Sequence, residues 1–462
     1  MKFAKIFSII LIAAISISIL GCSSPDKKTT KTKAKAVTTK ATQGQEQVVL
    51  QMWVMPNSLE PIKDIENLLV PFEKAHPNIK VQITSVDWGS AWTKITTAAT
   101  SGDSPDIVQL GSTWVGAISG MGGLVDLSGK VTEIGGGASF VSAAWTTAGL
   151  EGSGQVTSIP WFIDCRAAYY RTDVFKKLGL SISAFDSWQS FENTLKKIKE
   201  AKMEIEGVHI YPLGISGKND WNVIHNFSPW IWGSGGDYLS ADRKNSAINS
   251  KAAVEGVVFY TNLVKNDYIP LECLELNTAQ VSSNFNNGSY AIYFDGPYEI
   301  KTLTSPPEQG GAAGSVASRN FGIAHYPAGP KGRFTFIGGS NLSVFKYSKH
   351  QDEAWEVIKY LVSPDAQISY CKVNGFLPSK LAAFDNPFIK NDPYRKVFID
   401  AIKYGRTYPC ISSWGLLEPV LIRRLGIMWD HFLRGADDLN KLVTEELALA
   451  AQEINSVLSA GK

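Results

Sequence analysis

The chain has 462 residues and a hydrophobic fraction of 44%, which can bury large cores and favours two domains over one. Its formal net charge is +2, but Lys2, Lys5 and the charged residues of 23–47 carry the excess, and about −4 remains on the rest. Because nucleic-acid binding needs a basic patch on the folded body, this charge balance argues against a nucleic-acid partner.

The first segment has the layout of a secretory leader. Lys2 and Lys5 precede the apolar run 6–20, which is too short to span a bilayer comfortably. Gly21 and Cys22 follow at once, and this resembles a bacterial lipobox. The resemblance implies a lipoprotein signal peptide over residues 1–21 and a lipid on Cys22, which would anchor the protein on the outer, extracellular face of the cytoplasmic membrane. The alternative is an ordinary secretory signal with an incidental cysteine.

A tether is predicted over residues 22–47. The stretch is rich in Lys, Thr and Ala and has neither an aromatic residue nor periodic apolar positions. It cannot bury enough surface to fold, so we expect a disordered linker.

The residues after the tether alternate between strand and helix patterns. The predicted elements are a strand over 48–54, a helix around 68–75 with Pro71 at its start or at a kink, a strand over 79–83, a helix over 91–100 and a strand over 106–110. This order is typical of a doubly wound α/β domain.

Similar signals continue to the C-terminus. We predict extended segments at 159–166, 167–170, 213–215, 290–294, 337–341 and 375–378, and helices after Asp186 as N-cap, after Ser250, over 352–362 and over 445–458.

Several stretches, in this order, carry a family resemblance: FEKAHPNIKVQI, KITTAATSGDSPDIVQLGSTWVGAISGMGGLVDLS, IPWFIDCRAAYYRTDVFKKLGL, FNNGSYAIYFDGPYE and GGSNLSVFKYSKHQDEAWEVIKYLVSPDAQ. They resemble the extracellular solute-binding proteins of bacterial sugar ABC importers, family 1, the maltodextrin-binding-like proteins. The resemblance extends over residues 48–458. Each motif is loose, but their shared order is specific.

The resemblance implies an α/β, two-lobed periplasmic-binding-protein fold of type II. Each lobe would be a central sheet flanked by helices, and a three-segment hinge would join them. Lobe 1 would be residues 48–158 plus 338–375, and lobe 2 residues 159–337 plus 376–462. The implied partners are an oligosaccharide and the transmembrane subunits of an ABC permease, and we expect a monomer.

A sugar ring presents an apolar C–H face and a rim of hydroxyls, so its site needs flat rings together with fixed polar groups. Candidate platforms are Trp53, Trp88, Trp114, Trp161, Trp221, Trp230, Trp232, Tyr298 and Trp414. Candidate rim residues are Asn57, Asp87, Ser112, Thr113, Asp164, Arg166, Asp295, Ser340 and Asn341. Many of them follow predicted strands, where open α/β sheets bind ligands.

The family motifs assign ligand roles first to Asp164, Tyr298 and the turn 112–114. Core packing competes with ligand stacking for every indole, and we expect it to hold for about half of the tryptophans. Trp145, Trp355 and Trp429 have the pattern of core residues.

Four cysteines remain after Cys22, and none has the CxxC spacing of a metal site. We expect Cys165, Cys273, Cys371 and Cys410 to be buried thiols, with disulfides as the alternative. Neither a metal nor a cofactor is expected.

Three functions are compatible with these residues. The first is a receptor without catalytic residues that captures an oligosaccharide for import. Its ligand would be a di- to tetrasaccharide or longer, such as a β-glucan or xylan fragment. The second is a cell-surface glycoside hydrolase, which needs two carboxylates about 5–9.5 Å apart. The third is a scaffold that binds polymer on a flat face.

Overall fold

The computed structural model describes residues 47–218, 220–435 and 438–460. The predicted leader, Cys22 and all but the last residue of the predicted tether lie outside these residues. Within the described part, no helix combines the length and the apolar character that a membrane crossing requires.

Strands occur along most of the described chain. They are β1 (Val48–Val54), β2 (Ile79–Ser85), β3 (Ile107–Gly111), β4 (Ile159–Cys165), β5 (Ala167–Arg171), β6 (Glu204–Ile205), β7 (Val208–His209), β8 (Tyr211–Gly214), β9 (Tyr290–Asp295), β10 (Phe321–Ala324), β11 (Thr335–Val344), β12 (Leu377–Pro378) and β13 (Gly405–Arg406).

Helices fill most of the sequence between the strands. They are α1 (Pro61–Ala75), α2 (Trp88–Ser101), α3 (Val115–Gly120), α4 (Ser142–Trp145), α5 (Thr172–Lys177), α6 (Trp188–Ala201), α7 (Val223–Gly233), α8 (Lys251–Lys265), α9 (Thr278–Asn286), α10 (Tyr298–Thr304), α11 (Gln351–Leu361), α12 (Pro364–Asn374), α13 (Pro387–Lys390), α14 (Pro393–Ala401), α15 (Trp414–Leu433) and α16 (Leu439–Ala460).

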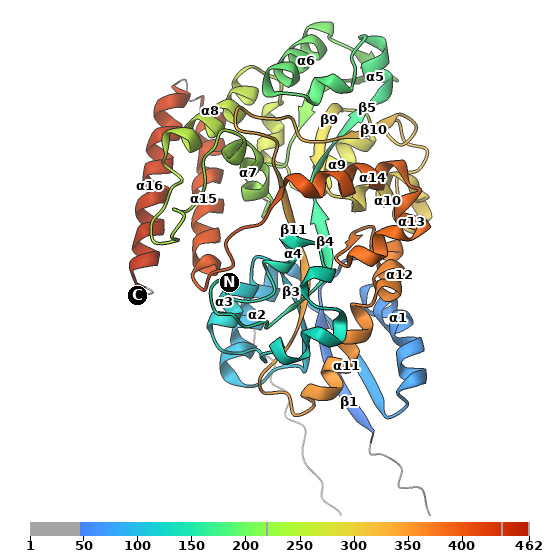
Figure 1. The fold of residues 1–462 in the computed structure, drawn as a ribbon. Coiled ribbons are helices and arrows are strands. Elements are labelled where there is room, and N and C mark those ends of the chain that lie inside the picture. Colours follow the sequence, from blue (N-terminus) through green and yellow to red (C-terminus); the bar gives the residue numbers. More distant parts are fainter. Residues whose placement is uncertain (1–46, 219, 436–437, 461–462) are drawn as a thin grey trace, which may run out of the picture. The chain divides into compact units, whose positions relative to one another are not determined.

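Two mixed sheets organise the described residues (Figure 1). A seven-stranded sheet has the order β12-β4-β11-β3-β1-β2, with β13 beside β11, and a four-stranded sheet has the order β10-β5-β9-β8. We call the half of the chain built on the first sheet lobe 1 and the half built on the second sheet lobe 2. The two-lobed α/β fold predicted from the sequence is confirmed.

Helices cover both faces of the mixed sheet of lobe 1. β1 pairs in parallel with β2 and β3, and β11 runs antiparallel to β3 and β4. Leu50, Met52 and Val54 pack with the apolar residues of α1, α11 and α12. On the other face, the apolar residues of α2 and α3 pack against Val108 and Leu110.

Lobe 2 has a core in which β5, β8, β9 and β10 pack with α6, α7 and α8. α15 packs along both α7 and α16, and Figure 1 shows α15 and α16 as neighbouring long helices. The first turn of α15 also packs against α3 of lobe 1. The C-terminal helices therefore belong to lobe 2, but one end of α15 reaches the other lobe.

The chain crosses between the sheets where three segments lie together. β4 is followed by β5 with Arg166 alone between them, and β12 pairs with β4 at Leu377. β11 pairs with β13 at its start and with β3 at its end. The exact residue boundaries of the lobes stay a prediction.

Two local expectations need correction. α1 begins at Pro61 and contains Pro71, so this proline does not start the helix, and the predicted kink at Pro71 stays a prediction. The N-cap of α6 is Ser187 in place of Asp186, since Ser187 and Ser190 form a reciprocal capping box. The cap of α8 by Ser250 was predicted correctly.

The four cysteines of the folded body, Cys165, Cys273, Cys371 and Cys410, are free and buried. The prediction that these four cysteines are buried thiols is confirmed, and the alternative that they form disulfides is not. Burial raises the pKa of Cys273 to about 11 and that of Cys410 to about 12, so both thiols are unreactive at neutral pH.

Candidate functional site

Arg166 occupies the single position between β4 and β5, where the chain passes from one sheet to the other. Its backbone is tied to β11, because Arg166 N donates to Phe336 O at 3.3 Å and Thr335 Oγ1 donates to Arg166 O at 2.7 Å. The guanidinium is therefore held at the junction of two crossing segments.

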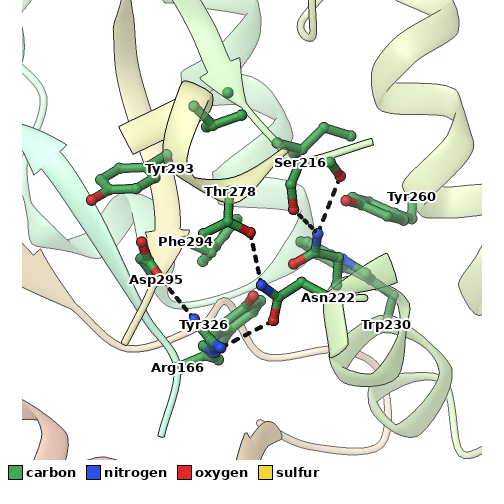
Figure 2. A pocket seen from close by; sticks show the side chains of 14 residues that line it. Arg166, Ser216, Asn222, Trp230, Tyr260, Thr278, Tyr293, Phe294, Asp295 and Tyr326 are labelled. Carbon is green, nitrogen blue, oxygen red and sulfur yellow. Dashed lines mark hydrogen bonds and ion pairs between the residues drawn. The ribbon is translucent and has the colours of Figure 1, made fainter. Parts of the chain in front are cut away.

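The guanidinium of Arg166 contacts its neighbour Asp164 and residues from two segments distant in sequence. Arg166 Nη1 donates to Asp295 Oδ1 at 2.6 Å and to Tyr298 Oη at 2.7 Å. Its Nη2 lies 3.0 Å from Asp164 Oδ2 and donates to Asn222 Oδ1 at 3.0 Å. Figure 2 shows Asp295 and Asn222 converging on this guanidinium. We call Asp164, Arg166, Asn222, Asp295 and Tyr298 the hinge cluster.

Burial sets the electrostatics of the hinge cluster. It raises the pKa of Asp164 to about 6 although the charge of Arg166 opposes the shift, and it also raises the pKa of Asp295. Burial acts to lower the pKa of Arg166, but the neighbouring carboxylates, Asp164 first, hold it well above its ordinary value. The cluster therefore keeps one fixed positive charge between two carboxylates that are costly to ionise.

Three atoms of the hinge cluster have no hydrogen-bond partner: Asp164 Oδ1, Asp295 Oδ2 and Arg166 Nε. All three side chains are more than nine-tenths buried. A buried polar atom without a partner costs about 1–3 kcal/mol, so these atoms are available to a bound molecule or to water.

A small cavity adjoins the cluster inside lobe 2 (Figure 2). It offers about 20 Å³ to the centre of a water molecule, which is room for about one water. Arg166, Asp295 and Asn222 line it together with Ser216 and Thr278. It lies where β8 and β9 end, because Ser216 follows β8 and Asp295 closes β9.

The predicted turn 112–114 lies beside the hinge cluster. Gly338 of β11 is directly across from Asp164 of β4, and a Cβ on Gly338 would lie 3.4 Å from Ser112 Oγ. Gly338 therefore has Ser112 on its β3 side and Asp164 on its β4 side. The structure brings together the three features to which the sequence assigned ligand roles first, namely Asp164, Tyr298 and this turn.

Half-buried indoles gather around the same turn in lobe 1. Trp114 packs against Trp88 at 5.5 Å and against Trp92 at 5.8 Å between ring centroids, and Trp53 joins this cluster. Asp87 is exposed and caps α2, since its Oδ1 accepts from Gly89 N at 2.9 Å. These rings are partly open to solvent and could stack on a flat ligand.

On lobe 2, Trp221 is the most accessible predicted platform, with 59% of its surface exposed. Its ring meets the edge of His225 at 5.1 Å, and His225 stacks on Phe336 at 3.8 Å. Tyr298 packs edge-on against Phe376 at 5.3 Å. Exposed and half-buried rings therefore stand on both lobes.

Four predicted platforms lie in the core instead. Trp161 and Trp414 are 0% exposed and Trp230 and Trp232 are 1% exposed. Trp161 stacks on Tyr370, Trp230 on Tyr260 and Trp414 on Tyr408, while Arg406 covers the ring of Trp232. Internal rings occupy their faces, so the structure does not present these indoles to a ligand.

Three predicted rim residues use their polar atoms for hydrogen bonds within lobe 1. Ser340 Oγ accepts from Gln109 Nε2 at 2.8 Å, and Asn341 Nδ2 donates to Thr147 O at 2.9 Å. Asn57 Nδ2 donates to Gln109 Oε1 at 3.0 Å. Their hydrogen bonds hold β1, β3 and β11 in place and do not point to a ligand role.

The structure adds two polar residues that the sequence analysis did not select. Asn222 completes the hinge cluster, and its neighbour Trp221 was the only signal for it. Glu418 lies one turn after Trp414 on α15, facing Thr113 of lobe 1. Burial raises the pKa of Glu418 to about 7, with the Thr113 hydroxyl acting in the opposite direction.

The two lobes touch in separate places around the cluster. A Cβ on Gly415 of α15 would overlap the ring of Trp92 in lobe 1. A Cβ on Gly310 of lobe 2 would lie 2.6 Å from Leu59, which follows β1. The lobes therefore contact each other at the start of α15 and at the segment after β1.

Comparison with known proteins agrees with this architecture. Residues 67–397 match the family model of the bacterial extracellular solute-binding proteins. The diacetylchitobiose binding protein DasA of Streptomyces coelicolor is 28% identical over 422 residues, which cover 90% of each chain. The multiple sugar-binding protein of Streptococcus mutans is 24% identical and covers 67% of this chain and 70% of its own.

Solved structures share the fold. The sugar-binding protein MalE of Xanthomonas citri aligns with a TM-score of 0.73 at 23% identity, covering 89% of this chain and 98% of that one. Because the family model spans well over half of the residues, the chain belongs to the bacterial extracellular solute-binding protein family.

Proposed function

We propose that the protein captures an oligosaccharide between its two lobes and delivers it to the permease of an ABC importer. The observation that carries the proposal is that the hinge cluster has unpartnered polar atoms and that both lobes carry exposed or half-buried indoles. Asp164 Oδ1 and Asp295 Oδ2 can accept hydrogen bonds from sugar hydroxyl groups. Trp221 and the Trp88–Trp114 pair offer flat ring faces. These are the two kinds of group that a sugar ring needs.

The similarity to DasA and to the multiple sugar-binding protein supports a sugar as the ligand. Rings on both lobes favour several subsites, and hence a di- to tetrasaccharide or longer. A ligand that bridges the lobes would favour the closed arrangement, since only that arrangement offers it contacts from both sides.

The proposed site has a smaller set of residues than the sequence predicted. It keeps Trp53, Asp87, Trp88, Ser112, Thr113, Trp114, Asp164, Arg166, Trp221, Asp295 and Tyr298, and it adds Asn222 and Glu418. The buried indoles Trp161, Trp230, Trp232 and Trp414 support it from the core.

Calorimetric titration of the purified body, residues 47–462, with oligosaccharide panels tests the proposal. We expect binding of at least one neutral oligosaccharide, with loss of binding in Asn222→Ala and normal binding in Asn193→Ala, an exposed asparagine on α6. Chromatography of the sugar after overnight incubation should recover it unchanged. Shortened products would favour a hydrolase, and binding of no sugar would contradict the proposal.

The membrane anchor is part of the same proposal and rests on the sequence around Cys22. Expression of the full chain in a Gram-positive host, with metabolic labelling by a fatty-acid analogue, should label the wild type at the membrane. Cys22→Ser should release unlabelled protein into the medium. Labelling of the variant would exclude Cys22 as the acylated residue.

A further inference from the structure

The hinge cluster carries more negative than positive charge. Asp164 and Asp295 share the one guanidinium of Arg166. Asp220 is a third carboxylate, which acts electrostatically on Asp295, and its two oxygens accept from Asn222 N at 2.7 Å and from Thr278 N at 2.6 Å. When Asp164, Asp220 and Asp295 are all ionised, their three negative charges outnumber the single positive charge of Arg166.

The terminal nitrogens of the Arg166 guanidinium are already engaged. Both terminal nitrogens of Arg166 already bind cluster residues, which leaves Nε as its one unpartnered donor. The cations nearest in sequence to the cavity and to β13 are paired as well. Lys218 lies 2.7 Å from Glu275, and Arg406 lies 2.7 Å from Asp237. An acidic group that entered the cluster would therefore meet carboxylates, and the terminal nitrogens of Arg166 are not free to compensate its charge.

The unpartnered atoms point to the same chemistry. Two of them are carboxylate oxygens, Asp164 Oδ1 and Asp295 Oδ2, and one is a donor. A molecule that satisfies them must bring more donors than acceptors. Hydroxyl and amino groups meet this need, whereas a carboxylate, phosphate or sulfate brings acceptors only.

Resting on the proposed function, we infer that the site selects by charge. It admits neutral and amine-bearing oligosaccharides, and it rejects sugars that carry a carboxylate, phosphate or sulfate at the ring held by the hinge cluster. Asp164 is the principal residue for this selection for two reasons. Its Oδ1 is unpartnered, and it lies opposite Gly338, whose other neighbour is Ser112 of the turn 112–114.

Glu418 adds to the selection from α15. Its side chain lies against Thr113, so it faces the same turn from lobe 2. The charged and titratable groups that act on Asp164 are Arg166, Asp295, Tyr298 and Cys165, and burial raises the pKa of Asp164 to about 6. At pH 7.5 Asp164 is therefore charged, and near pH 5 it is mostly neutral. Rejection of acidic sugars should weaken over that interval.

A capture experiment tests the inference without knowledge of the ligand. The body is incubated at pH 7.5 with pooled oligosaccharides from cellulose, xylan, starch, chitin, chitosan, pectin and alginate. After gel filtration and denaturation, the retained sugars are measured by mass spectrometry. One uncompensated like charge at about 6 Å predicts on the order of 100-fold depletion of acidic sugars relative to the input.

Two further measurements assign the selection to Asp164. In Asp164→Asn, which keeps the shape of the side chain, the acidic fraction should rise by about tenfold. Asp352→Asn, which removes an exposed charge from the first turn of α11, should leave it unchanged. If Asp164→Asn fails to fold, Glu418→Gln, which removes the other nearby acid of raised pKa, should still show a rise in the acidic fraction between pH 7.5 and pH 5.

The outcomes separate the two proposals. Retention of acidic sugars by the wild type in proportion to the input overturns the charge selection and leaves the oligosaccharide receptor standing. Retention of no sugar at all overturns both. Unchanged rejection in a folded Asp164→Asn, or in Glu418→Gln at pH 5, overturns the role of Asp164.

Discussion

Arg166 Nη1 lies 2.6 Å from Asp295 Oδ1, and this pair joins the segment between the two sheets to the end of β9 in lobe 2. Both side chains are almost fully buried, with Arg166 5% and Asp295 1% exposed. Removing one partner of a buried ion pair leaves the other charge uncompensated, so this pair is sensitive to substitution from either side.

Arg166→Met should lower the free energy of unfolding by about 3–5 kcal/mol, because it leaves two buried carboxylates without a counter-charge. A urea titration followed by tryptophan fluorescence measures the change. Arg319→Met is the control. Its guanidinium is half-exposed and lies 2.7 Å from Glu206, and such surface pairs contribute about 0–1 kcal/mol. An equal loss in both variants would show that Arg166 has no special role in stability.

Trp221 and Trp230 should separate ligand binding from stability. Trp221→Ala removes an exposed ring, so we expect little change in stability and about tenfold weaker binding of the captured oligosaccharide. Trp230→Ala removes a core ring that stacks on Tyr260, and it should cost about 3–5 kcal/mol of unfolding free energy. Thermal unfolding and calorimetric titration of each variant give both quantities. Full affinity in Trp221→Ala would remove this indole from the proposed site.

Glu418→Gln should stabilise the protein in a pH-dependent way. Burial raises the Glu418 pKa from 4.5 to about 7, so the folded state binds a proton that the unfolded state has lost over this interval. The free energy of unfolding of the wild type therefore falls as the pH rises from about 4.5 to 7, because Glu418 must ionise while it is buried. The glutamine variant is neutral at every pH and has no such loss. The difference should be near zero at pH 4 and on the order of 2 kcal/mol in favour of glutamine at pH 8.

Denaturant titrations at pH 4 and pH 8 measure this difference. Glu445→Gln, at an exposed position on α16, is the control and should change the unfolding free energy by less than about 0.5 kcal/mol at either pH. If Glu418→Gln is no more stable than the wild type at pH 8, the Glu418 carboxylate is not desolvated between the lobes.

Gly116 should be intolerant of a side chain for a reason outside its own helix. A Cβ on Gly116 of α3 would lie 2.6 Å from the carbonyl carbon of Cys410, which is backbone and cannot rotate away. Gly116→Ala should therefore cost about 1–3 kcal/mol although alanine favours helices. Gly129→Ala, where a Cβ meets nothing within 4 Å, should be neutral. Thermal unfolding of both variants checks the contrast, and equal stability would show that the segment at Cys410 is free to shift.

Much of the secondary structure could be predicted because its signals are local. The apolar run at the start of the body became β1, and Ser250 caps α8 as expected. Cap positions failed where two adjacent polar residues compete. Asp186 and Ser187 both suit an N-cap, and Ser187 takes it because Ser190 can complete the capping box.

The ligand roles of the tryptophans could not be predicted in the same way. Trp221 and Trp230 lie in one short stretch and carry the same side chain, yet one is 59% exposed and the other 1%. The difference arises because α7 turns Trp230 toward Tyr260 of α8, a contact between helices that sequence spacing does not specify.

The amino-acid sequence was enough to predict the family, the α/β class and the order of elements, since repeating apolar patterns and motifs report on neighbours along the chain. Which polar residues come into contact depends on the folded arrangement. Arg166 contacts Asp295, Tyr298 and Asn222 because three segments distant in sequence converge where β4 passes into β5. Their burial, and with it the raised pKa of Asp164, depends on packing from both lobes, which no local pattern encodes.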